Sequence, residues 1–306
     1  PAKKAATKTT AAKKAPAKKA ATKTTAAKKA PAKKAATKTE EKINMITAQL
    51  VKELRDRTGI SMMDCKSALT ETDGDIEKAI EVLRKKSVLK AEKKSGRETN
   101  EGAMVIGASK DGKFLIEVDT ETDFAAKDAD FQVFLKDLAD FCSSNNPNDL
   151  EHLNESFKDS LLSIIQKIGE NIKISHYSKV SSEGGFVFSY LHTDNKLAAL
   201  VKLDSDNEEL GRDLAMQIAA NNPLALSVDD IDPTIIDKEK EIALATLEGE
   251  NKPDDLKEKI VMGKIAKFQK ENSLLEQPFI KNPDQKIKEL LGDASILGFD
   301  RKKVGE

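Results

Sequence analysis

The sequence is poor in the residues that mark membrane proteins, secreted scaffolds and metal sites. Its 306 residues include no tryptophan, two tyrosines, three histidines and two cysteines. No apolar run approaches the length that spans a bilayer, and the N-terminus lacks the apolar core of a secretory signal. The two cysteines, Cys65 and Cys142, suit a reducing compartment, where we expect them to be buried free thiols. These absences predict a cytoplasmic protein that contacts no membrane.

Sequence motifs of catalysis and cofactor binding are also missing. None of the three histidines, His152, His176 and His192, lies in an HExxH pattern or beside a cysteine pair, so no metal site is expected. The chain has no GxxxxGK phosphate loop, no GxGxxG run and no GxSxG elbow. We therefore expect a protein without a cofactor, a small-molecule substrate or enzymatic activity. An enzyme of unknown type is the alternative.

Charge is distributed very unevenly along the chain. Residues 1–39 contain thirteen lysines and no acidic residue. The remaining residues include 38 basic and 52 acidic ones, a net charge of about −14. An acidic body of this kind is not typical of a nucleic-acid-binding domain.

The basic segment is an internal repeat. The sequence PAKKAATKTTAAKKA at 1–15 recurs unchanged at 16–30, and a third copy begins at 31. Its residues offer little to bury and its lysines repel one another, so 1–44 is predicted to be a disordered tail. The tail would either bind nucleic acid non-specifically through its phosphates or act as a solubilising segment, linker or fusion remnant. Met45 and the two residues after it resemble an independent start, which favours an appended module.

The region 45–97 is predicted to be a three-helix domain followed by a linker. Thr47 and Ser61 are suited to cap the first two helices, and Gly59 to end the first. The third helix carries an apolar stripe at helical spacing, made by Ile76, Ala79, Ile80 and Leu83. About forty residues of this kind can enclose only a small core.

From Gly102 onward the apolar period changes from that of a helix to that of a strand. Predicted strands at 103–108 and 114–118 flank Asp111-Gly112, a strong hairpin signal. Helices are predicted at 124–141 and 150–168, and a strand at 172–177.

The same pattern then recurs, with strands at 186–191 and 197–203 and a helix at 208–220. Gly112 and Asn195 are predicted to hold the same turn position. We expect two related α+β subdomains, 98–181 and 182–232, each an antiparallel sheet with helices on one face.

The residues 233–271 interrupt this pattern with two strongly charged helices, separated by a predicted turn at 249–253. Val261, Ile265 and Phe268 give the second helix a thin apolar seam, so we expect an antiparallel helical hairpin that protrudes. The segment 272–306 would complete the second subdomain, with a short helix at 284–291 and a last strand near 295–299.

Two features are unusual for a purely structural protein. Met62 and Met63 are adjacent at a helix start, so both cannot face a small core, and an exposed methionine adapts well to partner surfaces. Phe124 follows Asp123, the predicted N-cap, in a loop-to-helix corner that is usually solvated. The alternative for the methionines is that both are poorly placed core residues. The alternative for Phe124 is a hydrophobic staple that folds its ring back onto the sheet.

Five motifs follow one another along the chain: RDRTG with MMDCK at 55–66, TDFAAKD at 122–128, KIGENI at 167–172, SYLH at 189–192 and QPF at 277–279. In kind and order they resemble the signatures of the bacterial elongation factor Ts family, with Ala125 where many members have valine. The likeness covers about 46–298, and the repeat tail has no counterpart. It implies a UBA-like three-helix domain, a duplicated α+β core with antiparallel sheets, an inserted helical hairpin and a C-terminal segment.

The resemblance also implies a function. Members of the family are guanine-nucleotide exchange factors in protein biosynthesis. They act on elongation factor Tu, the GTPase that carries aminoacyl-tRNA to the ribosome. Phe124 would enter a pocket beside the Mg²⁺ and phosphates of the GDP-bound partner, with Thr122, Asp123, Lys127 and Asp128 in the same contact. The residues that would grip the partner elsewhere are Arg55, Met62, Met63, Lys66, Ile168, Gly169 and His192. The alternatives are a non-enzymatic nucleic-acid-binding protein that acts through its tail, and a ubiquitin-associated-like adaptor.

Overall fold

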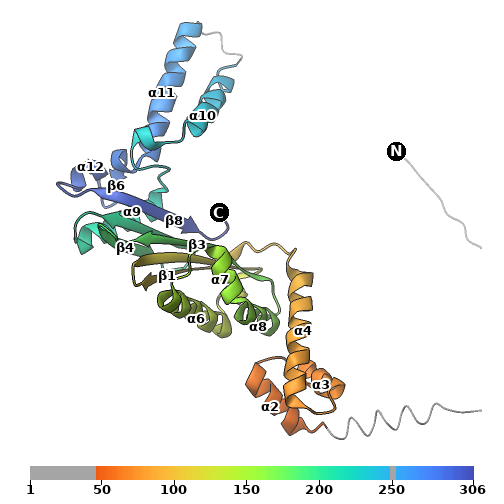
Figure 1. Ribbon diagram of the computed structural model, residues 1–306. Coiled ribbons are helices and arrows are strands. Elements are labelled where there is room, and N and C mark those ends of the chain that lie inside the picture. Colours follow the sequence, from red (N-terminus) through yellow and green to blue (C-terminus); the bar gives the residue numbers. More distant parts are fainter. Residues whose placement is uncertain (1–45, 249–252) are drawn as a thin grey trace, which may run out of the picture. The chain divides into compact units, whose positions relative to one another are not determined.

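The computed structural model describes residues 46–248 and 253–306. The predicted disordered tail at 1–44 and most of the predicted turn at 249–253 therefore lie outside the described residues. Within the two ranges, helices are combined with antiparallel sheets (Figure 1), which confirms the predicted mixed class. No helix in either range is long and apolar enough to cross a bilayer.

Three helices begin the described chain: α2 (Ala48–Thr58), α3 (Met62–Glu71) and α4 (Ile76–Lys94). As predicted, the hydroxyls of Thr47 and Ser61 cap the first two helices, each accepting a backbone N–H at 3.2 Å. Gly59 ends α2 in the left-handed conformation, with φ of 67°. The inward faces of the three helices form a small core that includes Leu54, Cys65, Leu69 and Leu83.

The first sheet is antiparallel, in the order β1 (Glu101–Ser109), β2 (Gly112–Thr120) and β3 (Ile172–Ser181). The predicted hairpin forms, but Ser109 pairs with Gly112, so the residues between them make the loop. Gly112 belongs to β2, where a β-carbon would overlap the backbone of β3 at Val180. Asn195 lies instead in a longer loop, with φ of 56°. The predicted equivalence of the two turns is therefore wrong.

Four helices follow or flank this sheet: α5 (Asp123–Ala126), α6 (Ala129–Asn145), α7 (Leu150–Ser156) and α8 (Lys158–Ile168). The prediction of two continuous helices, at 124–141 and 150–168, is wrong at two breaks. Asp128 is extended and caps α6 by accepting the N–H of Asp130 at 2.8 Å. Phe157 separates α7 from α8 and is buried edge-on against Phe134, with ring centroids 5.6 Å apart.

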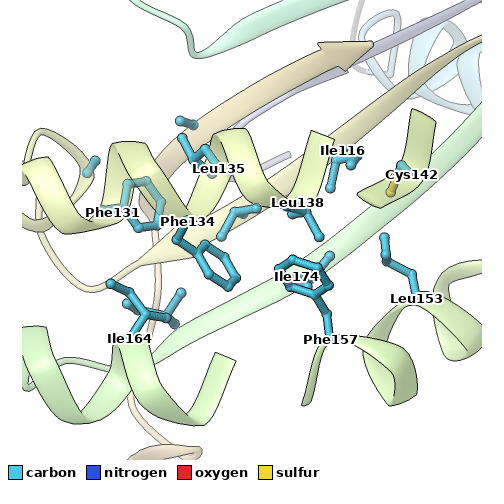
Figure 2. Packing of buried hydrophobic residues seen from close by; sticks show 14 of the residues in the cluster. Ile116, Phe131, Phe134, Leu135, Leu138, Cys142, Leu153, Phe157, Ile164 and Ile174 are labelled. Carbon is cyan, nitrogen blue, oxygen red and sulfur yellow. The ribbon is translucent and has the colours of Figure 1, made fainter. Parts of the chain in front are cut away.

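The largest core lies between the first sheet and these helices. Figure 2 shows Phe131, Phe134 and Leu138 of α6 among side chains from the neighbouring helices and strands. Cys142 is a buried free thiol of this core, and Cys65 is one in the three-helix core, as predicted. This packing fixes the helices on one face of the sheet (Figure 1).

The second sheet is also antiparallel, in the order β4 (Phe186–Leu191), β5 (Leu197–Leu203) and β8 (Ile296–Lys303). The first two strands match the predicted bounds, and β8 is longer than the predicted strand at 295–299. The helix α9 (Glu208–Asn221) packs against this sheet through Leu214 and Ile218.

Shorter elements connect α9 to β8: the 3-10 helices η1 (Val228–Asp230) and η2 (Leu274–Glu276), the strands β6 (Pro278–Phe279) and β7 (Asn282–Lys286), and α12 (Ile287–Leu290). The predicted helix at 284–291 is wrong in its first turn, because residues 284–286 belong to β7, where Lys286 pairs with Pro278 of β6.

The charged insertion forms two helices that lie side by side (Figure 1), α10 (Pro233–Ala245) and α11 (Asp254–Asn272). Asp232 caps α10, and Pro233 occupies its first turn. The seam is as thin as predicted, with Ala243, Leu247 and Val261 buried and Ile265 partly buried against them. Phe268, also predicted to lie in the seam, is outside this cluster.

The inner faces of the two sheets meet in a separate apolar layer. Met104 and Leu115 of the first sheet contact Val187, Ala198 and Leu200 of the second, and Val304 closes the layer. Helices lie on the outer faces, so each sheet has helices on one face, as predicted.

Buried acidic groups continue this layer along β2. Glu117 accepts the N–H of Gly305 at 2.9 Å and pairs with Lys302 at 3.3 Å. Asp119 is buried too, and one of its carboxylate oxygens has no hydrogen-bond partner. Burial raises the pKa of Asp119 to about 6, with the charge of Glu117 adding to the rise and Ser175 partly offsetting it.

This raised pKa predicts a pH dependence of stability. Between about pH 4 and pH 6 the folded state holds a proton on Asp119 that the unfolded chain has released, so the contribution of Asp119 to stability falls as pH rises through that window. Asp119→Asn should abolish this loss and raise the free energy of unfolding at pH 7 by about 1–3 kcal/mol. Urea unfolding at pH 4 and pH 7 measures the effect. The control Asp140→Asn, at an exposed position of α6, should show no such difference, and a destabilised Asp119→Asn at pH 7 would contradict the prediction.

Two helical glycines predict opposite effects of the same substitution. A β-carbon at Gly211 of α9 would overlap the ring of Phe188, whereas one at Gly263 of α11 would meet no atom within 4 Å. Gly211→Ala should therefore destabilise the protein by about 1–3 kcal/mol through overpacking. Gly263→Ala should stabilise its helix by roughly 0.5–1 kcal/mol, because alanine has the higher helix propensity. Urea unfolding followed by far-ultraviolet circular dichroism tests both, and shifts in the same direction would contradict the argument.

Candidate functional site

The corner between β2 and α5 is built by local hydrogen bonds. Thr122, extended at φ −131° and ψ 156°, is the N-cap, and its hydroxyl accepts the N–H of Ala125 at 3.3 Å. The prediction that Asp123 is the N-cap is therefore wrong, since Asp123 is the first residue of the helix. Its carboxylate accepts instead a hydrogen bond from Lys127 at 2.8 Å, which holds the pKa of Asp123 below its usual value.

Phe124 stands outward from this corner. Its side chain is 81% exposed, whereas the next two residues, Ala125 and Ala126, are buried. The predicted alternative of a staple folded back on the sheet is therefore wrong. Burying an exposed phenylalanine contributes about 1.5–3 kcal/mol, and this free energy is not gained in the free protein. The ring is thus available to a partner surface.

The loop after α8 lies beside the corner. Gly169 ends α8 with φ of 86°, and its N–H donates to the carbonyl of Ile165 at 3.0 Å. A β-carbon there would meet only Lys94, at 4.0 Å, so within this chain the glycine is required for its left-handed conformation. Ile168 is partly buried against the main core. Whether Gly169 also admits a partner's backbone stays a prediction.

Two acidic residues join the corner to this loop. The carboxylate of Glu170 accepts the N–H of Thr122 at 3.0 Å and its hydroxyl at 2.7 Å. In the opposite direction, the carboxylate of Glu121 accepts the N–H of Asn171 at 2.6 Å. The second and third motifs, far apart in the sequence, thus form one connected surface.

His192 lies in the loop between β4 and β5, exposed, with its Nδ1 3.0 Å from the hydroxyl of Tyr190. The same loop carries Lys196, which pairs with Glu101 at the start of β1. The positive charge of Lys196 also contributes to the lowered pKa of Asp123. Glu101 is in turn paired with Thr120 at the end of β2, so this loop is near the corner as well.

The other predicted grip residues lie on the three-helix unit. Met62 and Met63 are 50% and 76% exposed, so both are available to a partner, and Arg55 and Lys66 are exposed too. This unit contacts the end of α8, where a β-carbon on Gly59 would overlap the side chain of Lys167. The partner-binding roles of these residues stay predictions.

Sequence reasoning missed the residues that hold the site together. Glu170 and Asn171 were noticed only as letters of a motif, and Glu121 and Arg97 were not singled out. Position is the only sequence signal of three of them, since Glu121 adjoins the second motif and Glu170 and Asn171 lie within the third. Arg97 lies in none of the motifs. Across the described ranges, no three His, Cys, Asp or Glu side chains gather closely enough to hold a metal ion.

Comparison with known proteins gives a consistent result. The family model described as elongation factor TS matches residues 121–306. Elongation factor Ts of Marinobacter nauticus is 46% identical over 266 residues, which cover 85% of this chain and 91% of the relative. The Teredinibacter turnerae protein of that name is 44% identical over 267 residues, with the same coverage. That of Clostridium kluyveri is 42% identical over 286 residues, covering 86% and 94%. This chain therefore belongs to the elongation factor Ts family of translation elongation factors.

Proposed function

We propose that this protein is the guanine-nucleotide exchange factor of elongation factor Tu, and that Phe124 is its wedge. The ring would enter the GDP-bound partner beside the Mg²⁺ and phosphate site. Disturbing the surroundings of Mg²⁺ leaves the phosphate charges less neutralised and raises the energy of bound GDP. The observation that carries the proposal is the exposure of Phe124 on a short helix whose other apolar residues are buried.

The magnitude of the wedge effect can be bounded. Burying one phenylalanine contributes about 1.5–3 kcal/mol. At 1.4 kcal/mol for each factor of ten, that would weaken GDP roughly 10- to 150-fold. Because binding is reciprocal, GDP would weaken the factor by the same ratio. A useful exchange factor needs more, so further contacts must contribute.

The further contacts would come from two groups of residues. Thr122, Asp123, Lys127 and Asp128 would surround the wedge. Arg55, Met62, Met63 and Lys66 would grip the nucleotide-binding domain, while Ile168, Gly169 and His192 would hold the core against the partner. The exposed methionines suit this role because their flexible side chains adapt to a partner's surface.

We also propose that different segments of the chain have different roles in binding the partner. The UBA-like unit at 45–97 and the core subdomains at 98–181 and 182–232 would carry the contacts above. The hairpin at 233–271 would give a second grip at a distance, and 272–306 would complete the second subdomain. Non-specific nucleic-acid binding by the lysine-rich segment 1–44 stays a prediction, resting on the thirteen lysines and the absence of acidic residues in its first 39 positions.

The exchange function is tested with the intact chain and elongation factor Tu preloaded with labelled GDP. Adding the chain together with excess unlabelled GDP should accelerate label release in proportion to its concentration until saturation. A GTPase from outside translation, loaded in the same way, serves as the control and should keep its spontaneous rate. Release from elongation factor Tu at the spontaneous rate, with the chain in large excess, would refute the proposed function.

A further inference from the structure

The residue that fixes the exposed corner is Glu170. Its two carboxylate oxygens accept the backbone N–H and the side-chain hydroxyl of the same residue, Thr122. The hydroxyl of Thr122 in turn accepts the N–H of Ala125, inside α5. The carbonyl of Thr122 accepts a hydrogen bond from the hydroxyl of Thr120 at 2.8 Å. Every polar group of Thr122 is therefore bonded, two positions before Phe124.

A second carboxylate crosses in the other direction. Glu121 accepts the N–H of Asn171 and a hydrogen bond from the guanidinium of Arg97 at 3.2 Å. The buried side chain of Asn171 donates to the carbonyl of Arg97 at 2.9 Å. Burial acts to raise the pKa of Glu121, but the Asn171 N–H and Arg97 outweigh it and leave the pKa below its usual value. The corner and the loop after α8 thus hold each other reciprocally.

The corner needs such support, because α5 has only four residues. A single helical turn is not stable by itself, since its nucleation fixes several dihedral angles for few hydrogen bonds. The ring of Phe124, being exposed, supplies little packing of its own. A mobile ring would also have to be ordered when it enters a partner, at a cost in affinity. The orientation of the ring therefore depends on hydrogen bonds from outside the turn.

We propose that Glu170 is a positioning residue for Phe124, keeping the backbone of the corner in the one conformation that presents the ring outward. This inference rests on the proposed exchange function and deepens it. The hydrogen bonds of Glu170 go to Thr122, so it would act on Phe124 through that residue. Glu121 holds the loop that carries Glu170, so it supports the same arrangement from the other side.

The test compares Glu170→Gln with Glu155→Gln, which makes the same change of charge at an exposed position of α7. The glutamine keeps one acceptor oxygen but turns the other into a donor, so the Thr122 hydroxyl can no longer donate to that atom, and both contacts to Thr122 lose the charge of the carboxylate that strengthens them. In the isolated protein, amide hydrogen exchange at Thr122 and Ala125 should accelerate about 10-fold or more, while Ile116 in the middle of β2 stays protected. Catalysed GDP release should slow by a similar factor.

The Thr122 side of the bond gives an independent readout. Thr122→Val removes the hydroxyl and should slow GDP release, whereas Thr122→Ser keeps the hydroxyl and should restore the rate. Because Glu170 and Thr122 act as one unit, Glu170→Gln combined with Thr122→Val should cost much less than the product of the separate effects. Independent, multiplicative losses would contradict a shared bond.

The outcomes separate this inference from the proposed function. If Phe124→Ala slows release but Glu170→Gln changes neither amide exchange at Thr122 nor release, the positioning role is overturned. Loss of protection at Thr122 with an unchanged release rate overturns it too. An unchanged rate for Phe124→Ala would instead refute the wedge itself, whatever the amide measurements show.

Discussion

Truncation of Phe124 to alanine is expected to slow catalysed GDP release about 10-fold, and by several-fold at the least. The expectation follows from the 1.5–3 kcal/mol or so that burying a phenylalanine contributes, here available only in the complex because the ring is 81% exposed in the free protein. For the same reason the free energy of unfolding should change by less than about 0.5 kcal/mol. Stopped-flow release of fluorescent GDP and urea unfolding measure the two quantities.

Phe186→Ala is the matched control. Phe186 is also exposed, at 43%, but it begins β4, at the end of that strand away from the loop of His192. Its truncation should leave release close to the wild-type rate. Equal losses for the two variants would show that exposed apolar area in general, and not the corner, governs exchange. An unchanged rate for Phe124→Ala would exclude the wedge.

The largest effect on stability is expected at Phe131, where truncation to alanine should cost about 3–5 kcal/mol. The side chain is fully buried in the core of Figure 2, and its ring centroid lies 6.4 Å from that of Phe134. Removing the ring leaves a cavity between α6 and the first sheet that close-packed neighbours can only partly fill. Chemical unfolding of the purified protein measures the loss.

Val133→Ala, two positions along the same helix, is the control. Its side chain is 59% exposed, so truncation removes little packing and should shift the free energy of unfolding by less than about 0.5 kcal/mol. A small effect at Phe131, comparable to that at Val133, would mean that the core between α6 and the sheet contributes far less than its burial indicates.

Elements defined by local chemistry were predicted well. Thr47, Ser61 and Gly59 act at helix ends through bonds within a few residues, and the alternating strands β4 and β5 have the predicted bounds. The errors arise where tertiary packing overrides local pattern. Apolar periodicity runs through Asp128 and Phe157, but a cap and a buried ring divide the helices there. The strand β7 pairs with β6, whose two residues are too few to show the apolar alternation of a strand.

The candidate site was predictable in part for the same reason. The exposure of Phe124 and of the two methionines follows from their awkward positions at helix starts. The bonds that Glu170 and Asn171 make to the corner could not be predicted, because they join residues about fifty positions apart. A lone carboxylate in a chain with 34% charged residues carries no signal of its own. The partner-binding roles remain predictions that the experiments above decide.

The pairing of β8 with β5 has a consequence for biosynthesis. On a ribosome, β4 and β5 emerge long before β8, since everything from α9 to α12 lies between them. Until β8 has emerged, the β5 edge has unpaired N–H and C=O groups beside apolar residues such as Leu200 and Val201. An open edge of this kind invites association with other nascent chains. The second sheet can therefore close only after β8 has emerged, and nascent chains that stall before β8 would be prone to aggregate.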